Sequence, residues 1–267
     1  MEAISALVSI QMLSQFTNDR VPIIEESAVE SKRFGFSIGR LLIPFDSPIS
    51  DMDIATMCSQ SAFDLVIVRA NSTRNSLAES LLSLTSHRSL HADSLLYFGQ
   101  PLSPPALEKS PNSAVSLMGV LKESERVSFL DLIRETFANY TNHYSANSLL
   151  PKPLALEGYV EWATSLIDSA EGHIFVAHNN QEKLVSFIAV QSSGQTAEII
   201  LNGTSPAAQG LGIYPTLLNF VRSELFNLGF TELVTSTQSS NSNVIKVWIT
   251  SGFNYLAAIN TLHVMRH

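Results

Sequence analysis

The chain has 267 residues, more than the roughly 100–200 residues of an average domain, and its 16 basic and 24 acidic side chains give a net charge of −8. A hydrophobic content of 45% is ample for packed cores, and the acidic balance argues against a general nucleic-acid binder, which needs a basic face for the phosphates. Cys58 is the single cysteine, so an internal disulfide is excluded.

The sequence lacks the patterns of an export signal, a membrane span and a metal site. The first basic residue is Arg20, so the positively charged start of a secretory signal is missing. No apolar run approaches the ~20 residues that cross a bilayer, and no Cys/His cluster has zinc spacing. These features predict a cytoplasmic protein with no membrane partner and no metal.

The first hundred residues alternate between predicted helices and strands. Apolar periodicity predicts helices over 3–16, 51–61 and 76–86 and strands over 36–42, 63–69 and 91–98. Asp51 is expected to cap its helix. The strand over 63–69 is apolar almost throughout, which is typical of a strand buried on both faces. Alternation of this kind predicts an α/β domain.

Residues 99–113 hold four prolines and are interpreted as a linker. The predicted organisation is therefore an N-terminal α/β companion domain over 1–100, a proline-rich linker over 101–113, and a second domain over 114–267.

The second domain is predicted to have a mixed, mostly antiparallel sheet. Strands are expected over 115–121, 174–177, 184–191, 197–203, 233–237 and 255–265, and helices over 125–137, 154–169, 217–228 and 242–250. Ser124 is expected to cap the first of these helices. The last strand is expected to offer a free edge, and pairing of two such edges would give a homodimer.

A glycine-containing turn over 204–214 joins the strand at 197–203 to the following helix. Gly210 and Gly212 allow close approach of a ligand to the backbone. The free amides and the dipole of the helix start then favour an anion such as a pyrophosphate. The spacing fits neither a Walker loop nor a dinucleotide-binding fingerprint. The alternative is an ordinary strand-to-helix turn that binds nothing.

Three motifs in order resemble GNAT-type N-acetyltransferases. The segment from Gln209 to Tyr214 resembles the acyl-CoA loop of that family. Residues 241–253 begin with Asn241, carry an aromatic residue one turn from the helix end, and finish with Gly-Phe. Glu198 lies six positions before Thr204, the offset at which histone-acetyltransferase-like members place a general base. The resemblance covers the whole of 114–267.

This resemblance implies acetyl-CoA, or another acyl-CoA, as co-substrate and a small-molecule amine as acceptor. It assigns catalytic roles to Glu198, Asn241 and Trp248. Cofactor binding falls to Asn202, Gly203, Thr204, Gln209, Gly210, Leu211, Gly212, Ile213, Tyr214 and Asn241.

Two departures concern the chemistry of the leaving group and the phosphate loop. Trp248 stands where many family members have a tyrosine that protonates the thiolate, and an indole does not act as an acid at neutral pH. The thiolate then leaves without that acid, or Tyr255 or His263 replaces it, or the protein is impaired. Tyr214 and Pro215 are also atypical, because proline removes one amide from the loop.

The N-terminal half resembles the companion domain of TDP-fucosamine acetyltransferases over residues 31–41, 63–69 and 92–98. That resemblance implies a nucleotide-linked amino sugar as acceptor. His143 and Tyr144 are candidate acceptor-binding residues. Arg33, Arg40 and Arg69 are expected to be solvated surface residues, and the alternative is that they reach a diphosphate. Other acceptors, namely an amino acid, a polyamine or a protein lysine, remain open, as does a non-catalytic acyl-CoA-binding module.

Overall fold

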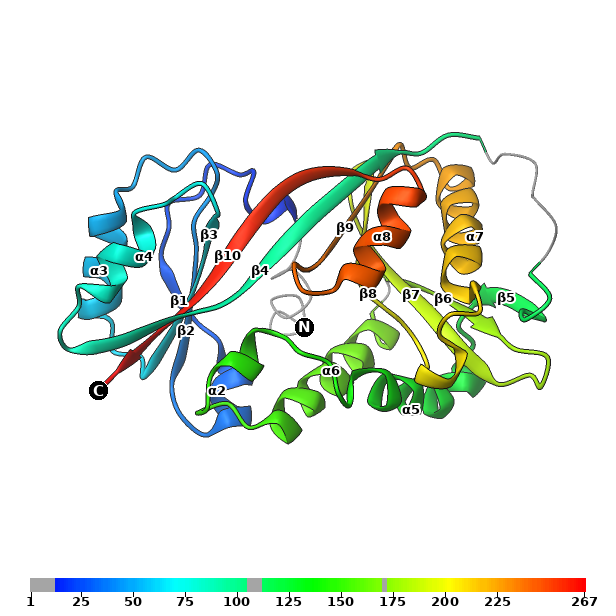
Figure 1. The fold of residues 1–267 in the computed structure, drawn as a ribbon, viewed down its shortest axis with the longest axis horizontal. Coiled ribbons are helices and arrows are strands. Elements are labelled where there is room, and N and C mark those ends of the chain that lie inside the picture. Colours follow the sequence, from blue (N-terminus) through cyan, green and yellow to red (C-terminus); the bar gives the residue numbers. More distant parts are fainter. Residues whose placement is uncertain (1–12, 105–111, 170–171) are drawn as a thin grey trace.

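The computed structural model describes residues 13–104, 112–169 and 172–267, and within these residues ten strands form one continuous mixed sheet (Figure 1). The strand order is β1-β2-β3-β10-β4-β9-β8-β7-β6-β5. The strands are β1 Ile24–Glu26, β2 Ile38–Leu42, β3 Leu65–Asn71, β4 His87–Pro101, β5 Leu117–Val120, β6 His173–His178, β7 Leu184–Ser193, β8 Thr196–Thr204, β9 Glu232–Gln238 and β10 Asn254–Arg266.

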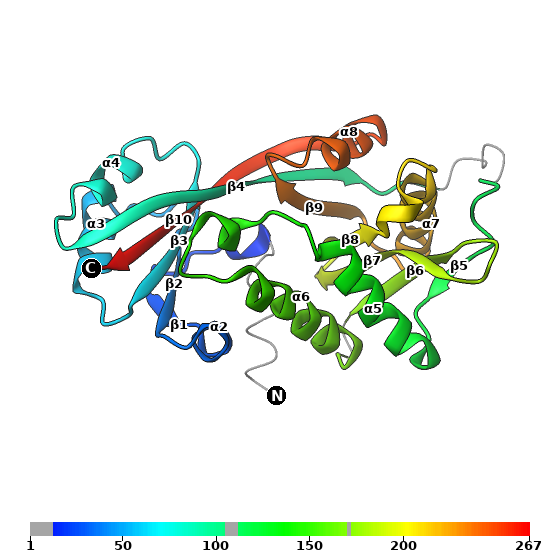
Figure 2. The same ribbon diagram turned by 60° about the horizontal axis from the view of Figure 1, so that its bottom comes forward.

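Helices cover both faces of this sheet. The α-helices are α2 Ala28–Phe34, α3 Asp51–Gln60, α4 Leu77–Leu82, α5 Arg126–Phe137, α6 Lys152–Ile167, α7 Ile213–Asn227 and α8 Ser242–Thr250. Short 3-10 turns are η2 Leu13–Gln15, η3 Glu123–Glu125, η4 His143–Ala146 and η5 Pro206–Ala208. Helices α5 and α6 lie together on one side, and α7 and α8 lie on the other (Figures 1 and 2). The mixed α/β fold class predicted from the sequence is confirmed.

Two long strands carry the sheet from one half of the chain to the other. The end of β10, residues 259–265, pairs with β3, and β10 pairs with β4 along most of its length. β4 then pairs with β9 from Leu95 to Pro101. The C-terminal strand therefore lies inside the sheet, and its predicted free edge is wrong. The apolar run of this strand marked it as buried, but pairing with residues almost 200 positions earlier leaves no local signal.

The predicted linker spans the end of β4 and residues outside the described range. Pro101 is the last residue of β4, and Leu102 donates its N–H to the carbonyl of Thr231 at 2.8 Å. Residues 105–111 lie outside the described residues, as do residues 3–12 of the helix expected over 3–16. The division of the chain into two domains stays a prediction.

Local capping differs from expectation at two helices. Ser50, and not Asp51, caps α3: its side-chain oxygen accepts the Asp53 N–H at 3.1 Å. Asp51 instead accepts from Arg74 at 2.9 Å. Ser124 lies inside the η3 turn, and α5 begins only at Arg126. In contrast, α8 covers the predicted span of residues 242–250.

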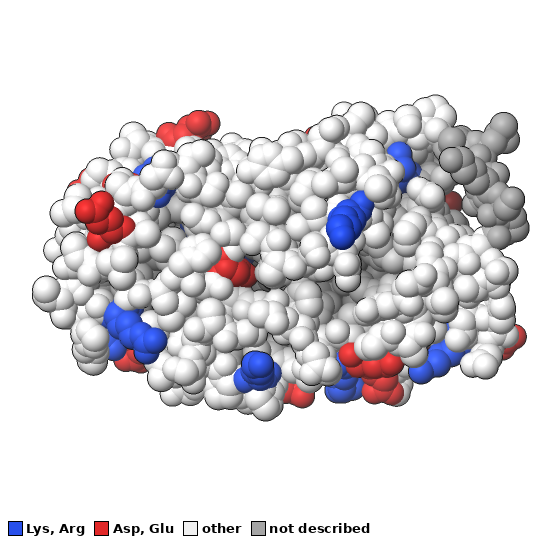
Figure 3. Space-filling model, viewed as in Figure 1, with Lys and Arg blue, Asp and Glu red and all other residues white. Residues whose placement is uncertain are grey.

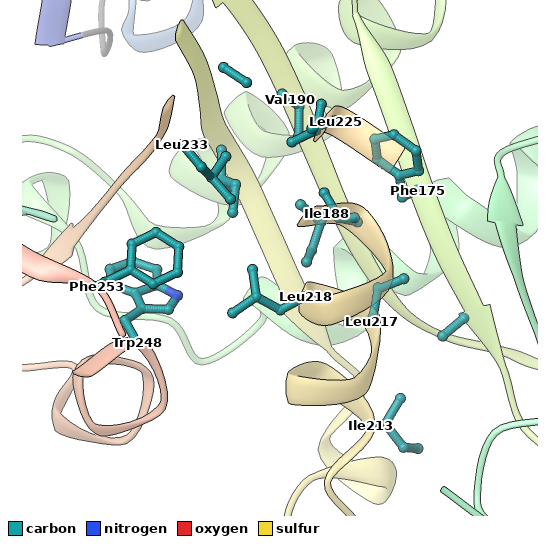
Figure 4. Packing of buried hydrophobic residues seen from close by; sticks show 14 of the residues in the cluster. Phe175, Ile188, Val190, Ile213, Leu217, Leu218, Leu225, Leu233, Trp248 and Phe253 are labelled. Atoms are coloured by element: carbon teal, nitrogen blue, oxygen red, sulfur yellow. The ribbon is translucent and has the colours of Figure 1, made fainter. Parts of the chain in front are cut away.

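A buried cluster holds α7 and α8 against the sheet. Leu217 and Leu218 of α7 pack on Ile188 of β7, while Trp248 and Phe253 close the cluster from α8 and the residues after it (Figure 4). The cluster fixes the start of α7 beside α8. The fold thereby sets the geometry of the turn that precedes α7.

Candidate active site

Strands β8 and β9 form a fork whose opening is a groove. They pair in parallel only from Thr196 to Ile199 of β8, and beyond this point they separate. A cavity of about 570 Å³ lies between them and extends to the starts of α7 and α8; we call it the fork groove. Figure 3 shows a hollow in the middle of the face between α8 and α5, with few charged side chains beside it.

The β8 side of the fork exposes backbone groups to the groove. Residues 201–204 pair with β7 on one edge, and their other edge has no strand partner in the described sheet. A ligand with an extended, amide-containing chain can pair with such an edge as an added strand does. Asn202, Gly203 and Thr204 all line the groove, as the resemblance implied.

The turn before α7 supplies an anion-binding end to the fork groove. Gly210 and Gly212 have φ of 78° and 73°, in the left-handed region that favours glycine. No hydrogen bond within the described part of the chain occupies the N–H groups of residues 210–214. They lie at the N-terminus of α7, where amides and dipole favour an anion.

Most of the predicted cofactor-binding residues come together here. Gln209, Gly210, Gly212, Ile213, Tyr214 and Asn241 line the fork groove. Leu211 is the exception, because its side chain is exposed and it does not line the groove. The Gln209 side chain donates to the carbonyl of Thr204 at 3.2 Å and so braces the turn against the end of β8.

Trp248 supports the groove from the core. Its side chain is fully buried, and its indole N–H donates to the hydroxyl oxygen of Tyr214 at 2.9 Å. Tyr214 lines the groove, and burial raises the pKa of its phenol. Of the two proposed replacements for the missing tyrosine, Tyr255 is 57% exposed and His263 is fully buried, and neither lines the groove.

Glu198 is buried at the closed end of the fork. It is 2% exposed, and one carboxylate oxygen accepts the Leu13 N–H at 2.9 Å. Burial raises the pKa of Glu198 to about 8, although that bond opposes the shift. The carboxylate of Glu198 is therefore strongly desolvated. Glu198 does not line the fork groove, however.

Simple alternation along β8 would place Glu198, Ile200, Asn202 and Thr204 on one face, but a β-bulge interrupts it. The register passes from Val190 paired with Ile199 to Ala189 paired with Leu201, which leaves Ile200 as the extra residue. Ile200 and Leu201 then both pack in the cluster that contains α5 and α6. A bulge re-aims the residues that follow it, so simple alternation fails here.

A second, smaller cavity adjoins the fork groove. It has a volume of about 60 Å³ and lies between β2, β3 and β4 and the elements α2, η4 and α6; we call it the polar cavity. Its polar lining includes Glu30, Arg33, Arg40, Arg69, Asp93, Asn142, His143, Tyr144 and Gln238. Leu95, Tyr159, Trp162 and Gln238 line both spaces. The two cavities therefore adjoin.

The candidate acceptor residues His143 and Tyr144 both line the polar cavity. His143 Nδ1 lies 3.0 Å from Nε2 of His263, and burial lowers the pKa of both imidazoles, so both are neutral at pH 7. The Tyr144 hydroxyl donates to Glu30. Burial alone would raise the pKa of Glu30, but the Arg40 guanidinium, with nitrogen and oxygen 2.6 Å apart, lowers it to about 2.

The arginines of the N-terminal half are buried, which corrects the expectation of solvated surface residues. Arg69 is 2% exposed, and Arg33 and Arg40 also line the polar cavity. Sequence reasoning missed this cavity because its walls come from distant segments. The sequence signals for this cavity were weak. They were the charged residue Arg69 at the end of an apolar strand and the acidic residue Asp93, two positions before Leu95.

No described helix has the length and apolarity to span a bilayer, and the described residues contain no group of three His, Cys, Asp or Glu side chains arranged for a metal. Cys58 is buried, which raises the pKa of its thiol to about 12.

Residues 131–253 match the family model of the Acetyltransferase (GNAT) family. Similar folds include a GCN5-related N-acetyltransferase from Sphaerobacter thermophilus, at 15% identity and a TM-score of 0.54, with 76% of this chain covered. This chain spans 59% of that protein. No curated protein matches the chain in sequence.

Two other solved structures match nearly the whole chain. A GCN5-related N-acetyltransferase from Kribbella flavida has 14% identity and a TM-score of 0.59, covering 99% of this chain and 95% of that one. A functionally unknown conserved protein from Staphylococcus epidermidis has 10% identity and a TM-score of 0.59, covering 97% and 99%. At these identities the likeness concerns the fold.

Proposed function

We infer that the chain, whose residues 131–253 form an acetyltransferase domain of the GNAT superfamily, transfers the acetyl group of acetyl-CoA to the amino group of a small molecule. One observation carries the inference most directly. The fork groove ends at the unoccupied amides of residues 210–214 at the start of α7. A pantetheine arm along β8 would bring the CoA pyrophosphate to those amides.

The described geometry supplies donors for the thioester carbonyl. The bulge at Ile200 and the free edge of residues 200–204 present backbone N–H groups to the groove. A backbone N–H directed at the carbonyl oxygen stabilises the negative charge that develops as the amine attacks. The acetyl group would therefore lie beside the bulge, close to where the fork groove meets the polar cavity.

Tyr214 is the proton donor that we assign to the leaving thiolate. Its oxygen accepts the Trp248 N–H, so its own hydrogen is free to point into the groove. The indole bond holds the phenol in place and favours the oxygen as it loses its proton. Trp248 thus has a positioning role, because it orients the phenol of Tyr214 and does not itself donate a proton to the thiolate. The absence of tyrosine at position 248 then does not require an impaired or non-catalytic protein.

The attacking amine must lose a proton, because an alkylammonium is protonated at neutral pH. Glu198 is one candidate acceptor of that proton, and its raised pKa suits the task. Because Glu198 does not line the groove and already binds Leu13, a water molecule would have to relay the proton.

The acceptor can be a compact amine or a nucleotide-linked amino sugar. The resemblance of the N-terminal half supports the sugar nucleotide, whereas the volume of about 60 Å³ in the polar cavity favours a compact amine. Competition by TDP separates the two, because a sugar-nucleotide acceptor site binds TDP and a compact amine site does not.

Release of CoA thiol from acetyl-CoA tests the proposed function. Wild-type protein is incubated with acetyl-CoA and a panel of primary amines, and thiol release is followed with a chromogenic reagent. We expect Gly210→Asp to abolish turnover by placing a carboxylate in the anion site. Gly194→Asp is the matched control, because Gly194 also has a positive φ and open space but lies outside the groove. Equal activity of the two variants would contradict the assignment of the groove.

A further inference from the structure

Five charged side chains line the polar cavity, and three of them form direct ion pairs. Glu30 pairs with Arg40 at 2.6 Å, and Arg33 pairs with Glu161 at 2.6 Å. Arg69 is within electrostatic reach of Asp93, the fifth charged residue that lines the cavity. Buried charges are retained only when they are paired or when a ligand completes them.

Asp93 differs from the other charged groups of the cavity. Both of its carboxylate oxygens are shielded from solvent, and neither accepts a hydrogen bond of normal geometry from the described part of the chain, although Thr261 and Gln238 lie close enough to lower the pKa of Asp93. Glu198, the other buried carboxylate near the groove, already accepts the Leu13 N–H. A carboxylate with two unoccupied acceptor oxygens in a cavity is a binding site for a group that carries several N–H donors.

The strand pairing directs Asp93 into the cavity. The register passes from Leu262 paired with His91 to Thr261 paired with Asp93, so Ala92 is the extra residue of a β-bulge. Bulges re-aim side chains and are common beside active sites. Thr261 stands opposite both Arg69 and Asp93, so the three side chains form one row on the same face of β3, β10 and β4.

A second unpaired polar group lies where the two cavities adjoin. Trp162 lines both of them and is only 8% exposed, and its indole N–H has no acceptor in the described part of the chain. Asp93 thus offers acceptor oxygens, and Trp162 offers one donor. The complementary ligand carries an ammonium group and an oxygen that accepts a hydrogen bond.

We propose that Asp93 binds the ammonium group of the acceptor and removes its proton, and that the acceptor is a small primary amine bearing a hydrogen-bond-accepting oxygen. The assignment rests on the proposed acetyltransferase function and names the substrate class and the base of that site. Asp93 replaces Glu198 in this role because it lines a cavity that adjoins the groove, whereas Glu198 lines neither space.

The proton inventory of this step is balanced. The ammonium gives its first proton to the Asp93 carboxylate, which later passes it to solvent. The neutral nitrogen attacks the thioester carbonyl, the C–N bond forms and the C–S bond breaks. The second proton leaves the nitrogen for solvent, Tyr214 gives its proton to the CoA thiolate, and the Tyr214 phenolate regains a proton from solvent, so that one proton is released overall. Burial raises the pKa of Asp93, opposed by Thr261 and Arg69, and this favours transient protonation.

The test compares amines that need a base with one that does not. Ethanolamine, glycine and putrescine are protonated at neutral pH, whereas hydroxylamine is already neutral. CoA release is measured with each amine for wild type, Asp93→Asn, Asp93→Glu, Glu198→Gln and the surface control Asp131→Asn. Thermal unfolding and acetyl-CoA titration of each variant verify that it is folded and binds the donor.

We expect Asp93→Asn to lower turnover of the best charged amine on the order of 100-fold or more, and of hydroxylamine less than about 10-fold. Asp93→Glu should restore part of the loss, ethanolamine or glycine should surpass putrescine, and Asp131→Asn should match wild type. The assignment would be overturned if Glu198→Gln, and not Asp93→Asn, selectively lost turnover of the charged amines. It would also be overturned if Asp93→Asn lost turnover equally with all amines, or if wild type turned over hydroxylamine alone. Absence of any turnover by wild type would instead contradict the proposed function itself.

Discussion

The fork groove and the polar cavity adjoin but are built from different parts of the chain. The groove presents backbone groups of β8 and of the turn before α7, segments that follow one another in sequence. The polar cavity is closed by side chains such as Arg33 and Glu161, which are 128 positions apart, and His143 and His263, which are 120 apart. A backbone site is therefore encoded locally, whereas a side-chain site depends on how distant strands pair.

The comparison extends to two buried carboxylates. Glu198 belongs to the closed end of the fork and is bound by Leu13, while Asp93 faces the polar cavity with unoccupied oxygens. Ionisation of Glu198 destabilises the folded state as pH rises, whereas the carboxylate of Asp93 is available to bind a ligand. Substitutions in the groove and in the polar cavity distinguish groups that affect stability from groups that bind a ligand.

The largest effect is expected from the ionisation of Glu198. Its pKa rises from an ordinary 4.5 to about 8 in the folded state, so the unfolded chain ionises first as pH rises. The contribution of Glu198 to stability should be greatest below pH 4.5 and fall until about pH 8, by up to about 5 kcal/mol. Urea unfolding of Glu198→Gln should lack this decline, whereas the exposed control Glu157→Gln should keep it. A decline unchanged in Glu198→Gln would show that other groups cause it.

The ion pair between Arg40 and Glu30 gives the next largest effect. Replacing Arg40 with methionine leaves the Glu30 charge buried and unpaired, which should lower the free energy of unfolding by about 3–5 kcal/mol. The exposed pair of Arg20 and Glu25 serves as the matched control, and Arg20→Met should cost less than about 1 kcal/mol. Equal losses measured by chemical unfolding would mean that the polar cavity is open to solvent.

Tyr214→Phe should affect activity more than stability. Removing the hydroxyl deletes the bond from Trp248 and should cost about 1 kcal/mol of stability. If the phenol protonates the thiolate, kcat should fall at least 10-fold while acetyl-CoA affinity changes little. Steady-state kinetics with hydroxylamine as acceptor measure this effect. An unchanged kcat would indicate that the thiolate leaves unprotonated.

Gly203→Ala is expected to give a smaller, local effect within the groove. An added Cβ would lie 2.5 Å from the Cγ2 atom of Thr136, so α5 and β8 must separate slightly. Overpacking of this kind costs about 1–3 kcal/mol and should weaken acetyl-CoA binding in parallel. The companion change Thr136→Ser removes the contacting methyl group and should restore both quantities. Failure of this rescue would locate the strain elsewhere.

The sequence predicted the features that depend on short-range pattern. The span of α8, the meander of β6 to β8 and the groove-lining glycines all follow from periodicity or from a contiguous motif. It failed where long-range pairing decides the outcome. β10 lies inside the sheet and Ile200 is a bulge residue, and no neighbouring residue signals either. Arg69 is buried, and its place at the end of an apolar strand was only a weak signal of this.

The size of the acceptor is the point on which the two halves of the chain give different indications. The motifs of the N-terminal half led us to expect the companion domain of a sugar-nucleotide enzyme, while the polar cavity that this half helps to close is small and densely charged. Buried arginines that already pair with Glu30 and Glu161 are less available to a diphosphate. Inhibition of turnover by TDP therefore tests whether the acceptor site holds a sugar nucleotide or only a compact amine.

Calorimetric titration of the wild-type protein with acetyl-CoA tests directly whether the fork groove binds this co-substrate. We expect binding at one site, displaced by CoA and lost in Gly210→Asp but retained in Gly194→Asp. Heat changes that are absent at millimolar acetyl-CoA, or that survive unchanged in Gly210→Asp, would contradict the assignment of the fork groove as the acetyl-CoA site.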